Sequence, residues 1–266
     1  MKILRALKSL RHLGRAFEVY RCLRMSKQPL TEFLAYLDLR RLNYPYMVSL
    51  HNGLRLKVLD WPDLTTAWVV FFGNEYRVKH DDKVIVDCGA NIGAFSLFAS
   101  LMAPHSRIFA IEPFPSTYRG LCEILESNRL NQRVTALNVA VVGVPRSVMM
   151  DDREGVASHS RRISEGVGVN VRGMSLEQIM EEQGLDEIDL LKVDIEGAEY
   201  ELVRDTPISA LRKVRRIGLE YHRNGNPGDI FEKLKSAGFR IGRYPKKGAS
   251  GAVSYTHLTL PTTPYV

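Results

Sequence analysis

The chain has 266 residues, of which 45% are hydrophobic and 25% are charged, and its formal net charge is +7. These values are typical of a globular protein with a substantial core, and no apolar run approaches the roughly 18 residues of a membrane span. We therefore expect a soluble, cytoplasmic protein. Cys22, Cys88 and Cys122 form no CxxC pair, which argues against a disulfide framework or a thiolate zinc site and for a reducing compartment.

The positive charge is concentrated in the first 27 residues, which hold eight basic residues and one acid, Glu18. The rest of the chain holds 29 of the 37 basic residues and 29 of the 30 acidic ones, so it is formally neutral. Apolar residues recur between these bases at helical spacing, and we expect residues 1–45 to form a basic amphipathic helical segment. This segment caps its own domain or packs in an oligomer, contacts the inner membrane surface through residues 1–27, or, as the least favoured reading, binds nucleic acid.

Residues 46–82 predict a β-hairpin, with its turn at His51-Asn52-Gly53, and a lead-in to the main domain. From residue 83 to 252 strands and helices alternate. We predict strands at 84–88, 107–111, 134–139, 188–193, 215–221 and 238–243, and helices near 93–102, 116–129, 175–183, 198–206 and 227–237. Residues 141–174 break this rhythm and predict an inserted hairpin or a mobile loop over the sheet edge.

The strands are short and continuously apolar, which is typical of a parallel sheet covered on both faces. The sequence therefore predicts an α/β fold with a doubly wound, mostly parallel, Rossmann-like sheet, preceded by the N-terminal helices and the hairpin. The final segment is different in kind. VSYTHLTLPTT, from Val253, resembles the translation of a sequencing adapter, so we expect residues 253–266 to be a non-native tail that replaces the natural C-terminus.

The segment VIVDCGANIG, from Val84 to Gly93, predicts a nucleotide-cofactor site. Asp87 ends the first strand of the sheet, and Gly89 and Gly93 allow a ligand to approach the backbone closely. Asn91 tolerates positive φ better than most residues. The G-x-x-x-G spacing differs from the dinucleotide pattern, and no Lys or Arg occurs between residues 84 and 106. A cofactor with an ammonium group and no phosphate fits better, so we expect S-adenosylmethionine (SAM), with its amino group paired to Asp87 directly or through water.

The next two strands extend this site. Glu112 ends the second strand, where a carboxylate can accept hydrogen bonds from both ribose hydroxyls. The third strand ends at Asn138 to Ala140, where we expect the adenine ring. The predicted cofactor-binding residues are Asp87, Gly89, Ala90, Asn91, Gly93, Glu112, Pro113, Asn138 and Ala140.

Three further blocks carry a family resemblance. VDCGANIGAFSLFAS, IEPFPSTYRGLCEILESNRLN and IDLLKVDIEGAEYELV, followed by IGLEYH, resemble the motifs of the FkbM family of SAM-dependent methyltransferases. The resemblance runs from about Tyr76 to Phe239. It implies a class I methyltransferase fold and transfer of a methyl group to a hydroxyl oxygen of a sugar, a glycan or a secondary metabolite.

The candidate catalytic residues follow the fourth and fifth strands of the sheet. Asp194 ends one strand, Glu196 follows in the turn, and Glu220 and His222 lie on the same side of the next. We expect Asp194 or His222 to act as base or to orient the acceptor, with Glu196 close by. A divalent cation such as Mg²⁺ held by these groups is an open alternative. Glu199 is interpreted as an acid that stabilises the helix dipole.

Other functions remain as alternatives. A nucleic-acid methyltransferase of the same fold would need a basic catalytic domain and an N/D-P-P-[YF] or Pro-Cys motif, and neither occurs. A non-catalytic SAM- or nucleotide-binding module is the second alternative. An NAD-dependent oxidoreductase is the third, and it requires the interpretation of Asp87 to be wrong.

Overall fold

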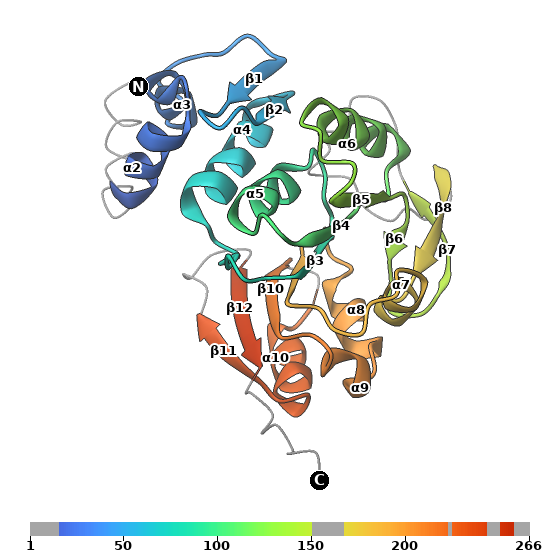
Figure 1. Cartoon of the computed structure of the whole chain (residues 1–266). Helices are drawn as coiled ribbons and strands as arrows, with labels where there is room; N and C mark the ends of the chain where they lie inside the picture. Colours follow the sequence, from blue (N-terminus) through green and yellow to red (C-terminus); the bar gives the residue numbers. More distant parts are fainter. Residues whose placement is uncertain (1–15, 151–167, 223–224, 244–250, 258–266) are drawn as a thin grey trace.

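The chain is built around a seven-stranded sheet with the order β11-β12-β10-β9-β3-β4-β5, as the computed structural model shows (Figure 1). The structure describes residues 16–150, 168–222, 225–243 and 251–257. The sheet strands are β3 (Val84–Cys88), β4 (Arg107–Ile111), β5 (Val134–Leu137), β9 (Leu190–Val193), β10 (Arg216–Tyr221), β11 (Phe239–Arg243) and β12 (Gly251–His257). The six predicted strands are therefore confirmed, with ends shifted by up to two residues.

Strand order reverses beside β3, and this reversal sets the position of the site. The chain runs from β3 outward to β4 and β5 on one side, and β9 and β10 lie on the other. All four pairings among these five strands are parallel, and Cys88 lies opposite both Ile111 and Val193. The carboxyl ends of these strands therefore meet at one edge, where open α/β sheets bind their ligands.

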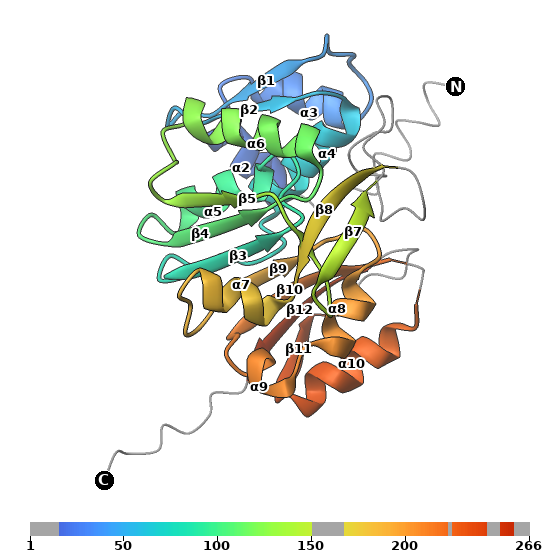
Figure 2. The same cartoon turned by 90° about the vertical axis from the view of Figure 1, so that its right-hand side faces the viewer.

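Helices cover both faces of the sheet, as a doubly wound fold requires (Figure 2). Successive strand residues point to opposite faces: Ile85 and Ile108 belong to one core, and Val86 and Phe109 belong to the other. The first core includes side chains from α5 (Ala94–Met102) and α6 (Pro115–Ser127). The second includes α7 (Leu176–Glu182), α8 (Glu199–Asp205), α9 (Ile208–Leu211) and α10 (Pro227–Ser236).

The N-terminal part packs on the first face. It contains α2 (Ala16–Met25), α3 (Pro29–Tyr36), the antiparallel hairpin β1 (Tyr46–Ser49) and β2 (Arg55–Val58), α4 (Trp61–Trp68) and the π-helix η2 (Val69–Gly73). The hairpin confirms the turn prediction, and Gly53 in that turn has a φ of +94°. Among the described helices none is long and apolar enough to cross a bilayer.

Residues 140–174 form a separate three-stranded sheet beside the main one. β7 (Arg146–Met150) and β8 (Val169–Met174) pair antiparallel, and β6 (Ala140–Val141) pairs parallel with β8. The insertion is thus a hairpin, one of the two predicted forms. The acidic run at 151–154 lies outside the described residues.

The last described strand falls largely on the segment that sequence analysis set aside. β12 pairs antiparallel with β10 on one side and with β11 on the other. The backbone of residues 253–257 is therefore part of the sheet, contrary to the expectation that only residues before the tail contribute to the fold. Strand pairing does not test where the tail sequence comes from, so its adapter origin stays a prediction.

Candidate functional site

A cavity of about 240 Å³ opens at the carboxyl edge of the sheet. Its wall combines residues after β3, β4, β6, β9 and β10 with Thr66 of α4, Val70 of η2 and Met150 of β7. The predicted site residues on this wall are Gly89, Ala90, Asn91, Glu112, Pro113, Ala140, Asp194, Glu196 and His222. Asp87, Gly93 and Asn138 are predicted site residues that do not line it.

The glycine loop is shaped by contacts within the protein. Gly89, Asn91 and Gly93 have φ values of +79°, +48° and +80°, so the expectation of positive φ at Asn91 is confirmed. A Cβ on Gly89 would lie 1.9 Å from the carbonyl oxygen of Asp194, and a Cβ on Gly93 would lie 2.8 Å from a methyl group of Leu121. These two glycines are needed because the loop packs on its neighbours, rather than because a ligand approaches them.

Asp87 lies behind this loop. Its side chain is fully buried, its Oδ2 accepts a 2.7 Å hydrogen bond from Ser96, and its Oδ1 lies 3.1 Å from the ammonium of Lys192. Direct pairing of Asp87 with a cofactor amino group is therefore not supported by its position. The sequence argument overlooked Lys192 as the cation that this acid neutralises.

Lys192 connects Asp87 to the loop and to the cavity. Its ammonium donates to the carbonyls of Gly89 at 2.6 Å and of Cys88 at 3.3 Å, and it lies 3.9 Å from the Asp194 carboxylate. Burial lowers the pKa of Lys192, but the nearby charges of Asp87 and Asp194 outweigh burial and raise the pKa above its usual value. Lys192 is thus a buried cation that pairs with carboxylates and does not snorkel to solvent.

Glu112 is placed as the sequence predicted. Its Oε2 accepts from the Asn91 amide at 2.8 Å and its Oε1 accepts from the Phe114 amide at 3.0 Å. Burial raises the pKa of Glu112 to about 7, against those two hydrogen bonds. Each carboxylate oxygen keeps a second lone pair on the cavity side of the loop. Asn138 is a supporting residue, since its side-chain amide donates to the carbonyls of Glu112 and Pro113.

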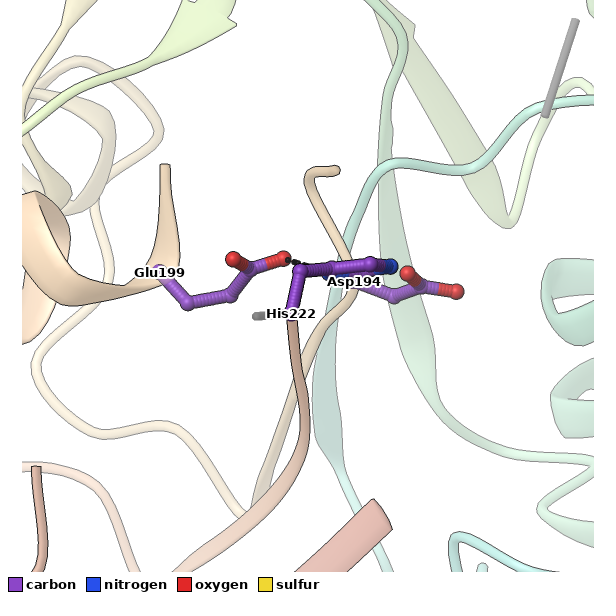
Figure 3. A group of neighbouring side chains, drawn as sticks. All are labelled: Asp194, Glu199 and His222. Atoms are coloured by element: carbon purple, nitrogen blue, oxygen red, sulfur yellow. Dashed lines mark hydrogen bonds and ion pairs between the residues drawn. The ribbon is translucent and has the colours of Figure 1, made fainter. Parts of the chain in front are cut away.

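Asp194, Glu199 and His222 meet on the other side of the cavity (Figure 3). The Nδ1 of His222 lies 3.0 Å from Oε1 of Glu199, and its Nε2 lies 3.4 Å from the carboxylate of Glu196. Glu199 is fully buried, and its Oε1 also accepts from the Ile195 amide at 3.0 Å. The interpretation of Glu199 as an acid serving the helix dipole alone was therefore wrong.

The charges of this cluster shift its pKa values in different directions. The hydrogen bond to Glu199 raises the pKa of His222 to about 9, against the effect of burial. Burial raises the pKa of Glu199, but the hydrogen bond with His222 outweighs it, and the pKa of Glu199 lies below its usual value. Burial raises the pKa of Asp194, against the opposing charges of Lys192 and His222. At neutral pH the site therefore holds a cationic His222 and a partly buried carboxylate at Asp194.

Two further residues of the cavity wall were not predicted as site residues. Glu220 lines the cavity, and burial together with the charge of Asp194 raises its pKa to about 7. Tyr76, which is 8% exposed, stacks edge-on against Phe95. Only the i, i+2 spacing of Glu220 and His222 could have signalled the first, and no local pattern signals Tyr76.

The ligand atoms of Asp194, Glu199 and His222 lie within 4.8 Å of one another, a spacing that could hold a metal ion. However, Nδ1 of His222 and Oε1 of Glu199 are directed at each other in a hydrogen bond. Both atoms would have to turn toward an ion and break that bond. The donor set thus fits a hydrogen-bonded His–Glu pair better than a divalent cation.

Comparison with known proteins gives consistent results. The profile of the methyltransferase FkbM domain matches residues 87–241. The chain is 30% identical over 192 residues to methyltransferase sdnD of Sordaria araneosa, covering 60% of this chain and 74% of that protein. It is 25% identical over 189 residues to 31-O-demethyl-FK506 methyltransferase FkbM of Streptomyces tacrolimicus (59% and 73%). It is 26% identical over 157 residues to hexuronic acid methyltransferase AglP of Haloferax volcanii (59% and 63%).

Among solved structures, methyltransferase FkbM from Methylobacillus flagellatus KT superposes with a TM-score of 0.53 at 16% identity. The match covers 94% of this chain and 60% of that one. This chain thus spans less than two thirds of the length of that structure and of AglP. The likeness agrees with a Rossmann-like class I methyltransferase fold.

Proposed function

This chain belongs to the FkbM methyltransferase family, and on that premise we propose that it transfers a methyl group from SAM to a hydroxyl oxygen of a sugar, a glycan or a secondary metabolite. One observation carries the proposal. A ribose-type acceptor, Glu112, and a candidate proton acceptor, Asp194, line the same cavity from different strands. The printed names of two relatives, a 31-O-demethyl-FK506 methyltransferase and a hexuronic acid methyltransferase, support hydroxyl and sugar acceptors respectively.

The cofactor half of the cavity fits a nucleoside with hydrogen-bond donors. Glu112 offers two carboxylate oxygens to the ribose hydroxyls. The side-chain oxygen of Asn91 is buried and accepts no hydrogen bond from the residues that the structure describes, so it suits a donor on the ligand. Ala140 and Val141 supply an apolar wall for the adenine ring. When bound, SAM supplies an electrophilic methyl group on a sulfonium.

The other half of the cavity can hold and activate an acceptor hydroxyl. Displacement at a methyl carbon is in-line, so most of the catalysis consists of positioning the acceptor oxygen. Asp194 is the better base, because its pKa lies above its usual value and a carboxylate near the acceptor can take its proton. His222 is protonated and donates from Nε2, while Glu199 holds Nδ1 and so fixes the orientation of the ring.

The alternatives differ in what they require of this cavity. A nucleic-acid methyltransferase would need a cationic surface at its mouth, whereas the chain after residue 27 is formally neutral. An NAD-dependent enzyme would need room for a pyrophosphate beside the loop, where Asp87 lies directly behind. A non-catalytic module would have no use for a proton acceptor at Asp194, and the family to which the chain belongs is one of enzymes.

The test combines binding with turnover. Isothermal titration should detect S-adenosylhomocysteine and not NAD, and a panel of sugars and polyols should be methylated with SAM and not with NAD present. Asp194→Asn should abolish turnover and keep S-adenosylhomocysteine affinity, whereas Asp186→Asn, at an exposed position outside the cavity, should change neither. Turnover should persist in EDTA, because the His–Glu pair occupies the candidate metal ligands. Folded protein that binds no S-adenosylhomocysteine would refute the proposal.

A further inference from the structure

Helix α2 has two apolar sides, and only one of them packs on the protein. Cys22 is buried, and Val19 and Met25 pack against the first core. On the opposite side Phe17 and Leu23 are 64% and 58% exposed, and Tyr20 between them is 51% exposed. A helix whose only apolar contact is its own domain needs one apolar side, so the second side is available to another surface.

The exposed apolar side also carries arginines. The guanidinium of Arg21 lies 4.7 Å from the ring centre of Phe17, and that of Arg24 lies 5.8 Å from the ring centre of Tyr20. With about 100° between successive helical residues, these side chains and Leu23 span an arc of roughly 160°. The outer face of α2 is defined here as Phe17, Tyr20, Arg21, Leu23 and Arg24. It lies at the periphery of the molecule (Figure 1).

The single acid of the basic N-terminal segment lies on the inward side of α2. Glu18 accepts a 3.0 Å hydrogen bond from the indole of Trp68 in α4. The negative charge that could neutralise the arginines is therefore held against the body of the protein. The outer face of α2 consequently offers aromatic and aliphatic groups with positive charge alone, in a chain whose first 27 residues hold eight bases.

We propose that the outer face of α2 binds the surface of an anionic lipid bilayer. Aromatic and leucine side chains bury into the boundary between headgroups and acyl chains, while neighbouring arginines contact anionic headgroups. A second copy of the chain is a poorer occupant, because two such faces would bring the same positive charges together. A polyanion without an apolar phase would leave Phe17 and Leu23 in water. This inference goes beyond the proposed function and does not depend on it.

The test is flotation of the full chain with vesicles. Protein should float with vesicles of phosphatidylcholine mixed with phosphatidylglycerol and stay behind with phosphatidylcholine alone, and high salt should weaken the binding. The double variant Phe17→Ser/Leu23→Ser should bind at least about tenfold more weakly, because burying one such side chain is worth about that factor. The matched control is Val144→Ser/Val169→Ser, which removes two exposed apolar side chains from the 140–174 insertion and should bind like the wild type.

The charge half is tested by Arg21→Glu/Arg24→Glu, which should lose the preference for anionic vesicles. All variants alter exposed or half-buried side chains, so their circular dichroism spectra and melting temperatures should match the wild type. Three results would overturn the proposal: equal binding to both vesicle types, wild-type binding by Phe17→Ser/Leu23→Ser, or a lipid-free dimer in sedimentation that this variant dissolves. Retention by RNA at physiological salt that displaces the vesicles would overturn it as well.

Discussion

Replacing Gly89 by alanine tests the idea that the glycine loop and the catalytic turn are fitted against each other. The added Cβ would lie 1.9 Å from the carbonyl oxygen of Asp194, whereas ordinary contacts begin near 3.4 Å, so the two loops must separate by about 1.5 Å. The obstacle is backbone, which cannot turn aside as a side chain can. Since Asp194 itself lies on the moving segment, a displacement of this size should lower turnover by about 100-fold or more.

The backbone strain at this position needs its own control. Gly89 has a φ of +79°, where an L-residue costs about 1–2 kcal/mol whatever the space around it. Gly184 has a φ of +60° and nothing within 4 Å of an added Cβ, so Gly184→Ala isolates that strain. For a chain of this size it should lower the melting temperature by roughly 2–8 °C and leave turnover unchanged.

Gly93→Ala provides an intermediate case, because its Cβ would meet the end of the flexible Leu121 side chain at 2.8 Å. The assay is calorimetric melting combined with methyl transfer at saturating SAM. We expect the loss of stability to rise from Gly184→Ala through Gly93→Ala to Gly89→Ala, with a large loss of turnover in the last. The reasoning fails if Gly89→Ala falls no further than Gly184→Ala in both measurements.

Three other expectations follow from the charged groups. Because Glu199 holds the pKa of His222 at about 9, wild-type activity should decline above pH 9, and Glu199→Gln should move that decline to lower pH; an unmoved alkaline limb in the pH–rate profile would contradict the role of the pair. Burial raises the pKa of Glu220 from 4.5 to about 7, so the wild type loses stability as pH rises through that window and Glu220→Gln does not; the difference between their melting temperatures should grow from pH 5 to pH 8, and a constant difference would count against it. The ion pair of Asp82 with Arg216 is buried, so Asp82→Ala should cost about 3–5 kcal/mol in urea unfolding, and a loss below about 1 kcal/mol would show that the pair behaves as an exposed one.

The sequence predicted the sheet well, because its strands are read from apolar runs that end at acids and glycines. Strand tips share an edge whenever parallel strands are adjacent, so Glu112, Asp194 and His222 could be assigned to one site without coordinates. What one strand does to another was not readable. Lys192 reaches Asp87 across a strand pairing that joins residues about a hundred positions apart, and so the acid expected to face a cofactor is neutralised inside the protein.

Glu199 illustrates a second limit. Its place in the first turn of a helix explains an acid there without any site, and composition offers no reason to look further. Its burial depends on His222, which comes from the next strand and closes over it. The contributions of Thr66, Val70 and Tyr76 to the cavity wall are of the same kind, because the packing of the N-terminal part on the sheet is long-range and leaves no periodic signal.

The π-helix η2 sets a limit on the length of the chain at one point. A π-helical turn contains one residue more than the α-helix around it, and such turns arise readily by single insertions. Val70 on the cavity wall lies within this turn, directly after the α4 residues that hold Glu18 and the first core. Deleting one residue between 69 and 73 would let α-helical pairing continue and would rotate all that follows by about 100° about the helix axis. Substitutions in this segment are local in effect, whereas a change of length would be transmitted to the cavity. Related chains should therefore vary in the composition of this stretch far more than in its number of residues.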